Sequence, residues 1–232
     1  MIALDQRGHG ESQWLENGAY TLSDHFSDIA GFVEALRLYP LILLGHSMGG
    51  RNALFYAACH PHRVARLILV DARPASNSQG SESLRNLLAN FPRQASSLEE
   101  GVGILHSLYP FLSKKICRHI FRHGFNRISA ARFIPRCDLR MTQELERSDG
   151  AIEDLWPFLE NVSCPTLIVR GQDSSFLSRE EAQAMCRRIP GAELREIPKA
   201  AHLPAQENPR AFRKAVIQFL EQKIKDEPQR TK

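Results

Sequence analysis

LILLGHSMGG, residues 41–50, decides the fold of this 232-residue chain. The apolar run at 41–44 is typical of a buried strand, and residues 52–59, rich in Ala, Leu, Phe and Tyr, are typical of a helix packed on a sheet. Glycines stand two residues before and two residues after Ser47. They indicate a turn where the chain approaches itself too closely for most side chains. The pattern therefore places the Ser47 hydroxyl on a sharp turn between a strand and a helix.

Apolar runs of strand length recur along the chain, with helical patterns between them. Residues 67–70 and 166–169 resemble the first run, and residues 193–197 form an amphipathic one. Apolar residues spaced by three and four between 20 and 37 predict a helix. Two more helices are predicted where Ser178 and Glu181 match a capping box and where Asn208-Pro209 offers a cap followed by proline. This alternation indicates a mostly parallel sheet covered by helices.

Residues 75–157 break the alternation and predict several short helices without a strand. We therefore expect one α/β core, residues 1–74 and 158–232, with a helical lid inserted at 75–157. A chain of this length with 43% hydrophobic residues can bury one substantial core. Basic residues gather in the lid between 113 and 140, where the single acid is Asp138: Lys114, Lys115, Arg118, Arg122, Arg127, Arg132, Arg136 and Arg140. They indicate either an entrance that attracts an anionic substrate or partner, or a solvated helical face.

Composition excludes several classes of function. A formal net charge of +4 is too small to indicate nucleic-acid binding. The five cysteines are widely spaced and lack a C-x-x-C pair, which argues against a disulfide framework and against a zinc site. No apolar run approaches the roughly 20 residues that span a bilayer. Residues 1–5 predict a strand rather than a signal peptide, so we expect a cytoplasmic protein without a membrane span.

Four segments together resemble the α/β-hydrolase superfamily: DQRGHGES at 5–12, the turn around Ser47, VRGQD at 169–173 and AHLP at 201–204. The resemblance covers nearly the whole chain except the insertion. It implies an α/β-hydrolase fold, a nucleophile elbow at Ser47, and a triad in the chain order Ser47, Asp173, His202. It also implies hydrolysis of a carboxylic ester or related acyl bond of a small molecule through an acyl-enzyme, with no metal or organic cofactor.

The chemistry of acyl transfer requires the same groups. A serine hydroxyl is a poor nucleophile until a base removes its proton, and an imidazole such as that of His202 can do this and return the proton to the leaving group. A carboxylate is then needed to hold the other ring nitrogen. The Met48 amide begins the helix after the turn and is the expected oxyanion donor.

Two aspartates are candidates for that carboxylate. Asp173 follows the run at 166–169, as the family order requires, and is preferred. It stands two residues after Gly171, whereas families with this motif place the acid three or four residues after the glycine. Asp71, directly after the run at 67–70, is the alternative, because some lipases of the superfamily carry their acid at the end of this strand. Asp71 would otherwise brace the strand end.

The front of the chain differs from the resembled family, whose sheet begins with earlier strands and a His-Gly loop that gives a second oxyanion donor. Residues 2–4 are therefore expected either to pair with 41–44, or to leave a gap in the sheet, or to belong to a fragment. Loss of one donor lowers turnover by about 10² to 10³-fold in other hydrolases, so the sequence does not predict whether this chain is active.

Two other functions remain alternatives. Arg51, one residue after Gly50, favours a carbon-carbon bond hydrolase or lyase acting on an acidic metabolite, if its side chain is not a surface residue of its helix. A noncatalytic binding protein with the same fold is the alternative from another class. The substrate and the oligomeric state are not predicted.

Overall fold

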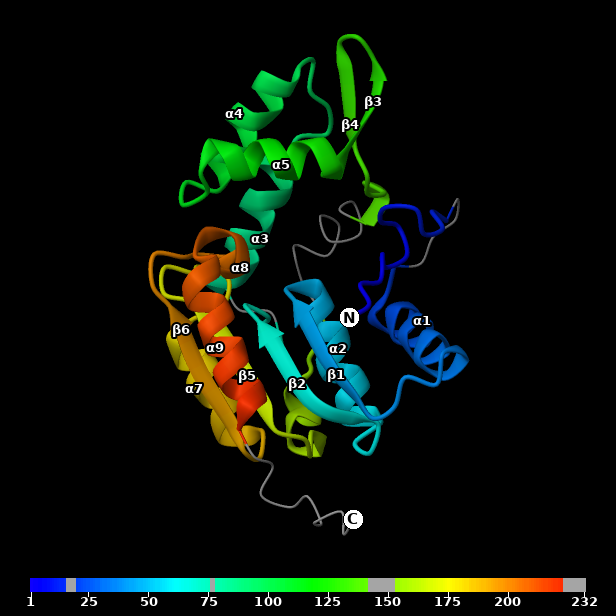
Figure 1. Ribbon diagram of the computed structural model, residues 1–232, viewed down its shortest axis with the longest axis vertical. Helices are drawn as coiled ribbons and strands as arrows, with labels where there is room; N and C mark the ends of the chain where they lie inside the picture. Colours follow the sequence, from blue (N-terminus) through cyan, green and yellow to red (C-terminus); the bar gives the residue numbers. More distant parts are fainter. Residues whose placement is uncertain (16–19, 76–77, 142–152, 223–232) are drawn as a thin grey trace.

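The computed structural model describes residues 1–15, 20–75, 78–141 and 153–222. Four parallel strands form its main sheet in the order β1 (Leu41–His46), β2 (Val64–Val70), β5 (Thr166–Gly171) and β6 (Ala192–Ile197). All four predicted strand runs are confirmed. Because the strands are parallel, the segments that follow them gather at one edge of the sheet, which faces the top of Figure 1.

Helices cover the sheet on two faces. Leu67 and Leu69 of β2 pack in one core with α1 (Leu22–Ala35), α2 (Met48–Cys59), α7 (Arg179–Arg188) and the 3₁₀ helix η1 (Trp156–Asn161). Ile68 and Val70 alternate to the other face and pack with α9 (Pro209–Glu221), which follows the short helix α8 (Pro204–Glu207). This alternation is the period of two that a strand imposes.

The predicted helix starts are confirmed in detail. The Ser178 side chain accepts from the Glu181 N–H, and the Glu181 carboxylate accepts from the Ser178 N–H, which completes the capping box of α7. Asn208 accepts from the N–H of Ala211 at the start of α9. Within the described ranges, no helix is both long enough and apolar enough to cross a bilayer.

The expected strand at residues 2–4 is absent, and that prediction is wrong. Ile2 and Leu4 are exposed and belong to no strand. The sheet order leaves the outer edge of β1 without a strand partner among the described residues, so Ile42 and Leu44 are 53% and 48% exposed. A segment with no neighbouring strand has no ladder of hydrogen bonds to hold it extended.

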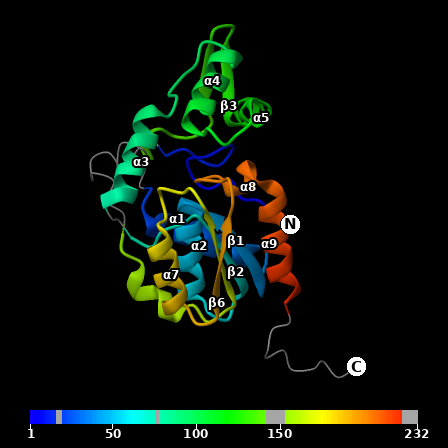
Figure 2. The same cartoon turned by 90° about the vertical axis from the view of Figure 1, so that its left-hand side faces the viewer.

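Residues 78–135 form a separate layer beyond the carboxyl edge of the sheet, which we call the cap (Figures 1 and 2). It contains α3 (Ser78–Asn90), α4 (Leu98–Leu108), α5 (Lys114–Gly124) and an antiparallel hairpin of β3 (Phe125–Ser129) and β4 (Arg132–Pro135). The helices were predicted, but the prediction of no strand is wrong. Residues 126–132 are exposed along their whole length, so the hairpin lacks the alternation of buried and exposed residues by which a strand is predicted.

The cap has its own hydrophobic core, which is tied to the sheet edge. Phe121 and Phe125 stack at 4.3 Å between ring centroids, and Val102, Leu105 and Cys117 are buried with them. Leu203, in the segment between β6 and α8, packs against this core. The cap therefore contacts the same edge of the sheet at which Ser47 lies.

Candidate active site

Ser47 occupies the turn that the glycines predict. It has a positive φ of 51°, a conformation that a residue with a side chain rarely adopts, and its N–H donates to the Val70 carbonyl at 2.9 Å. A Cβ at Gly45 would lie 2.2 Å from the Gly49 carbonyl oxygen, and one at Gly50 would lie 2.4 Å from the Cβ of Ala72. Close approach thus requires glycine at positions 45 and 50. A Cβ at Gly49 would meet only the side-chain nitrogen of Gln6 at 3.2 Å, so the predicted requirement for glycine there is not confirmed. The half-buried Ser47 side chain stands at the end of β1.

Met48 is the first residue of α2. The amides of Gly50 and Arg51 already donate to the Ser47 carbonyl, whereas the Met48 N–H has no acceptor among the described residues. The unpaired amides at a helix start carry partial positive charge. Met48 therefore offers a donor to an anion that forms beside the Ser47 hydroxyl.

His202 is buried in the segment between β6 and α8. Its Nδ1 lies 2.8 Å from Oδ2 of Asp71, and its ring stacks on Phe176 with a centroid distance of 3.8 Å. Glu207 holds the backbone on both sides of the ring, accepting from the N–H of Ala201 at 2.6 Å and of Leu203 at 3.1 Å. Burial raises the pKa of the Glu207 carboxyl. Phe176 thus fixes the face of the imidazole, Asp71 fixes its Nδ1, and Glu207 fixes the backbone on both sides of His202.

Asp71 follows β2 directly, with a positive φ of 44° and a side chain that is fully buried. Besides the His202 ring, its Oδ2 accepts from the Ser174 hydroxyl at 2.7 Å. A buried carboxylate needs such donors, because an unpaired one would be costly. Among the described residues, Asp71 is the carboxylate that lies within hydrogen-bond distance of the His202 ring.

The expected contact between Asp173 and His202 is therefore corrected. Asp173 is exposed, its N–H donates to the Ala200 carbonyl at 2.9 Å, and its carboxylate has no partner among the described residues. The next residue, Ser174, is the one that points inward. Asp71, at the end of β2, reaches His202 across the end of β5, so the carboxylate that contacts the His202 ring is that of Asp71 and not that of Asp173.

Ser47 and His202 lie at the same edge of the sheet, and His46, the residue before Ser47, contacts His202. The Nε2 of His46 lies 2.6 Å from the His202 carbonyl oxygen, and the two imidazole rings are 4.7 Å apart. The Ser47 hydroxyl itself makes no hydrogen bond within the described part of the chain. Ser174, Phe176 and Glu207 were not predicted as site residues. The short spacing from Gly171, which places serine where an acid was expected, was the one signal in the sequence that concerned any of them.

His46 is neutral at physiological pH. Burial, followed by the nearby His202, lowers the pKa of His46 to about 4. Since a carbonyl oxygen accepts, the neutral ring must carry its proton on Nε2 and donate it to His202. This hydrogen bond helps to fix the loop on which His202 lies.

The lowered pKa of His46 predicts a pH-dependent stability. Between the unfolded pKa of about 6.5 and the folded value, the unfolded state binds the extra proton, so the free energy of unfolding decreases as the pH falls. The His46 contribution should decrease by about 2 kcal/mol from about pH 8 to about pH 5. Urea unfolding of the wild type and of His46→Gln at several pH values measures it as the difference between the two. A difference that does not vary with pH would contradict the prediction.

Arg51 does not present its charge to the site. Its guanidinium donates to the carbonyl oxygens of Arg73, Pro74 and Glu153 at 2.8–3.1 Å and pairs with the Glu153 carboxylate at 3.4 Å. Burial lowers the pKa of Arg51 to about 10. The side chain is thus neither a surface residue nor a free cation, and it braces α2 against the segment after β2.

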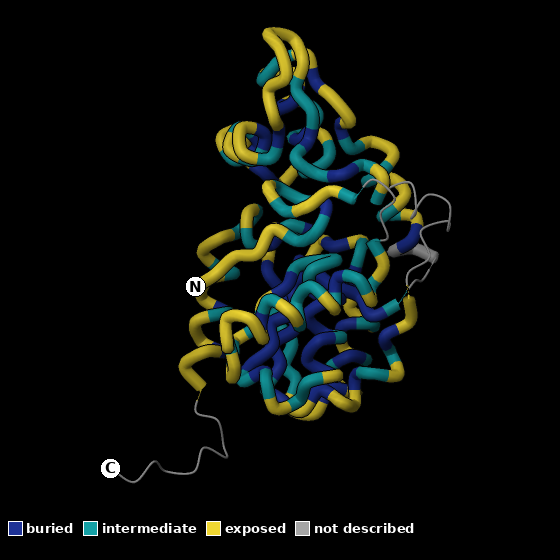
Figure 3. The backbone as a smooth tube through the Cα atoms, turned by 90° about the vertical axis from the view of Figure 1, so that its right-hand side faces the viewer, coloured by how far each residue is buried: buried dark blue, intermediate teal, exposed yellow. Residues whose placement is uncertain are grey.

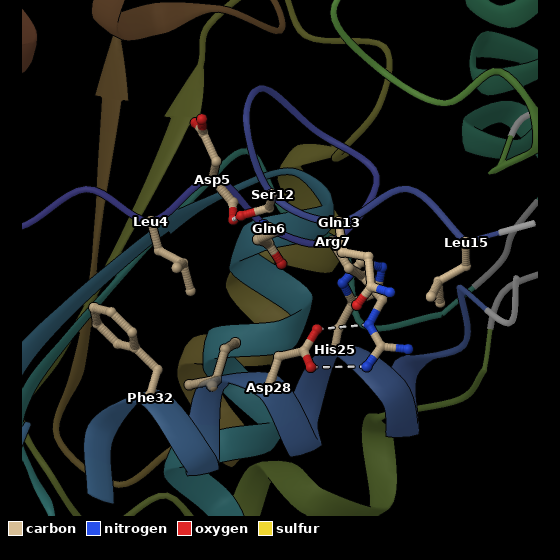
Figure 4. A pocket seen from close by; sticks show the side chains of 11 residues that line it. Leu4, Asp5, Gln6, Arg7, Ser12, Gln13, Leu15, His25, Asp28 and Phe32 are labelled. Carbon is tan, nitrogen blue, oxygen red and sulfur yellow. Dashed lines mark hydrogen bonds and ion pairs between the residues drawn. The ribbon is translucent and has the colours of Figure 1, made fainter. Parts of the chain in front are cut away.

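A cavity of about 260 Å³ lies between the N-terminal segment and α1 (Figure 4). Arg7 and Asp28 line this cavity and form an ion pair with each other. Ser47, Asp71 and His202 do not line it. In the described ranges, no three His, Cys, Asp or Glu side chains are grouped so that they could bind a metal ion.

Comparison with known proteins places this geometry in a family. Residues 1–209 match the family described as alpha/beta hydrolase fold. The chain belongs to this family. A 2-(acetamidomethylene)succinate hydrolase of Mesorhizobium japonicum is 28% identical, over 95% of this chain and 78% of the relative. The crystal structure of an E-2-(acetamidomethylene)succinate hydrolase has a TM-score of 0.81 at 27% identity, covering 94% of this chain and 80% of that one.

A further α/β hydrolase with a solved structure is an esterase. The esterase Rv0045c of Mycobacterium tuberculosis has a TM-score of 0.72 at 25% identity, and the match covers 94% of this chain and 73% of that one. The similar proteins thus include hydrolases of different substrates. The predicted fold is confirmed, and the predicted general class of reaction is the one that these relatives share.

Proposed function

We propose that this α/β hydrolase cleaves a carboxylic ester or a related acyl bond of a small molecule through an acyl-enzyme on Ser47. The observation that carries the proposal is the hydrogen bond of 2.8 Å between the buried Asp71 and His202, at the sheet edge where Ser47 has a strained backbone. Ser47 is the proposed nucleophile, His202 the base and Asp71 the acid of the triad.

Each residue has a defined step. The Nε2 of His202 takes the Ser47 proton as Oγ attacks the acyl carbon, and gives it to the leaving group as the carbon–oxygen bond breaks. Water then attacks the acyl-enzyme, again assisted by His202. Asp71 accepts from Nδ1–H throughout, which fixes the tautomer and stabilises the imidazolium. The missing contact between Ser47 and His202 is consistent with this role, because such hydrogen bonds often shorten only with substrate bound.

The Met48 amide is proposed to stabilise the negative charge that forms on the reacting oxygen. Its N–H is free among the described residues and begins α2, whose dipole favours an anion there. We assign no second donor. Since one donor contributes about 10² to 10³-fold in turnover, a low turnover would be compatible with an intact triad.

The substrate is proposed as a small acyl compound. The similarity to a succinate-derivative hydrolase and to an esterase supports hydrolysis, and the two relatives differ in what their names say they act on. A carbon-carbon bond hydrolase or lyase that acts on an acidic metabolite stays the second candidate. A relative from Klebsiella pneumoniae, 25% identical over 95% of this chain, is named a 2-hydroxy-6-oxononadienedioate/2-hydroxy-6-oxononatrienedioate hydrolase. Arg51 does not support this candidate, because its donors are occupied by backbone carbonyls.

A covalent probe tests the proposal without requiring turnover. The chain is treated with a fluorophosphonate and its intact mass is measured, with Ser47→Ala as the control. We expect one adduct on the wild type and none on the variant, because an activated serine attacks phosphorus as it attacks an acyl carbon. The adduct is mapped to Ser47 by digestion.

The opposite result would support the noncatalytic binding protein. A cooperatively folded wild type that stays unlabelled has no activated serine, and an adduct that persists in Ser47→Ala lies on another residue. Either outcome removes Ser47 from the mechanism. Circular dichroism of both proteins shows whether the samples are folded.

A further inference from the structure

The basic residues of the cap are concentrated on one half of α5. Successive side chains of a helix turn by about 100°, which places Lys114, Lys115, Arg118, His119, Arg122 and His123 within one half of its circumference. Ile116, Cys117, Ile120 and Phe121 occupy the other half and pack in the cap core. The helix contains no acidic residue. Its outward half thus carries only lysine, arginine and histidine side chains.

This charge is largely unpaired. Arg118 pairs with Glu99 at 3.3 Å. Lys114, Lys115 and Arg122 are exposed and have no ion pair or hydrogen bond within the described ranges. Like charges held close on one face repel each other, and an anionic partner or screening salt relieves this repulsion.

One exposed apolar side chain precedes the helix in the sequence, and another lies on the hairpin that follows it. Phe111, two residues before its N-cap Ser113, is 42% exposed, and Ile128, on β3 directly after it, is 53% exposed. The hairpin tip and the outer side of the cap are exposed at the end of the molecule away from α1, α2 and α7 (Figure 3). Exposed lysine and arginine side chains with single apolar side chains nearby are typical of a protein surface that binds lipid headgroups.

We propose that the α5 face of the cap binds the surface of an anionic phospholipid bilayer. Lys114, Lys115 and Arg122 contact the headgroups, and Phe111 and Ile128 enter the interface. Since the apolar half of α5 is occupied by the cap core, the helix adds no apolar face of its own, and binding is reversible and sensitive to salt. In this arrangement the cap is the part of the protein that contacts the membrane. This inference does not depend on the proposed reaction.

Vesicle co-sedimentation tests it with the full chain. Phosphatidylcholine vesicles are compared with vesicles that also contain phosphatidylserine. We expect binding to the anionic vesicles alone, reversed by high salt. Each basic side chain near such a surface contributes about fivefold in partitioning, so Lys114→Gln/Lys115→Gln/Arg122→Gln should lower it by about 100-fold. Ile128→Ser should weaken binding further without changing the salt dependence.

A matched control removes three charges elsewhere. Arg187→Gln/Arg213→Gln/Lys214→Gln changes exposed residues of α7 and α9 and has the same net charge as the α5 variant. It should keep most of the binding. Equal loss in both variants, equal binding to neutral vesicles, or retained binding by the α5 variant would overturn the proposal. Binding to polyglutamate or to duplex RNA without binding to anionic vesicles would also overturn it. Thermal unfolding shows that the variants are folded.

Discussion

His202→Gln is expected to lower turnover of a p-nitrophenyl ester by about 10⁶-fold, the effect of removing the base in another serine hydrolase. In the proposed mechanism no other group within the site takes the Ser47 proton. Glutamine fills a similar volume but cannot accept and return a proton near neutral pH. His202 is buried against Phe176 and bonded to Asp71, so the substitution changes the chemistry more than the surface.

His46 supplies the matched control, since its ring lies 4.7 Å from that of His202. His46→Gln keeps a donor for the His202 carbonyl and should lose about tenfold or less, the scale of one hydrogen bond. Turnover and the rate of fluorophosphonate labelling are measured for both variants. If His46→Gln lost more than His202→Gln, the assignment of the base would have to be reversed.

Asp71→Asn is expected to lower turnover by about 10⁴-fold, as the equivalent change does in another triad. The carboxylate accepts from the Nδ1–H of His202, and an amide would favour the wrong tautomer and give no charge to oppose the imidazolium. Asp173→Asn is the control, because that side chain is exposed and unpartnered among the described residues. It should change turnover by less than about twofold, in line with the small effects of exposed substitutions.

The pair of variants distinguishes the two acids directly. Full activity of Asp71→Asn together with inactivity of Asp173→Asn would restore the acid preferred from the family order. Asp71 also accepts from Ser174, so Ser174→Ala is measured beside it for unfolding in urea. A large loss of activity in Asp71→Asn with unchanged stability assigns the effect to catalysis.

What the sequence predicts well is local. The turn at Ser47 and the loop of His202 follow from glycines, prolines and the strands that precede them, all within a few residues. The choice between Asp71 and Asp173 depends on which strand ends lie side by side and which side chain points inward. Only the three-dimensional arrangement gives that information, because Asp71 and His202 are 131 residues apart.

The two strand errors have a related cause. Residues 2–4 were expected to be extended from their composition, but they do not pair with the free edge of β1 and therefore lack a ladder of hydrogen bonds. Residues 125–135 form a hairpin although their exposed side chains show no alternation, because the two strands pair with each other. Pairing is a property of two segments, and the pattern within either one does not contain it.

Leu203, beside His202, packs against the core of the cap. For protein engineering this means that cap and reaction centre are not independent modules. Exchanging the cap for another, or repacking Val102, Leu105 or Phe121 with larger side chains, would push on the residue next to the base. Close-packed interiors transmit such strain rather than absorb it. A cap transplanted for a new substrate therefore has to carry a cavity that fits Leu203.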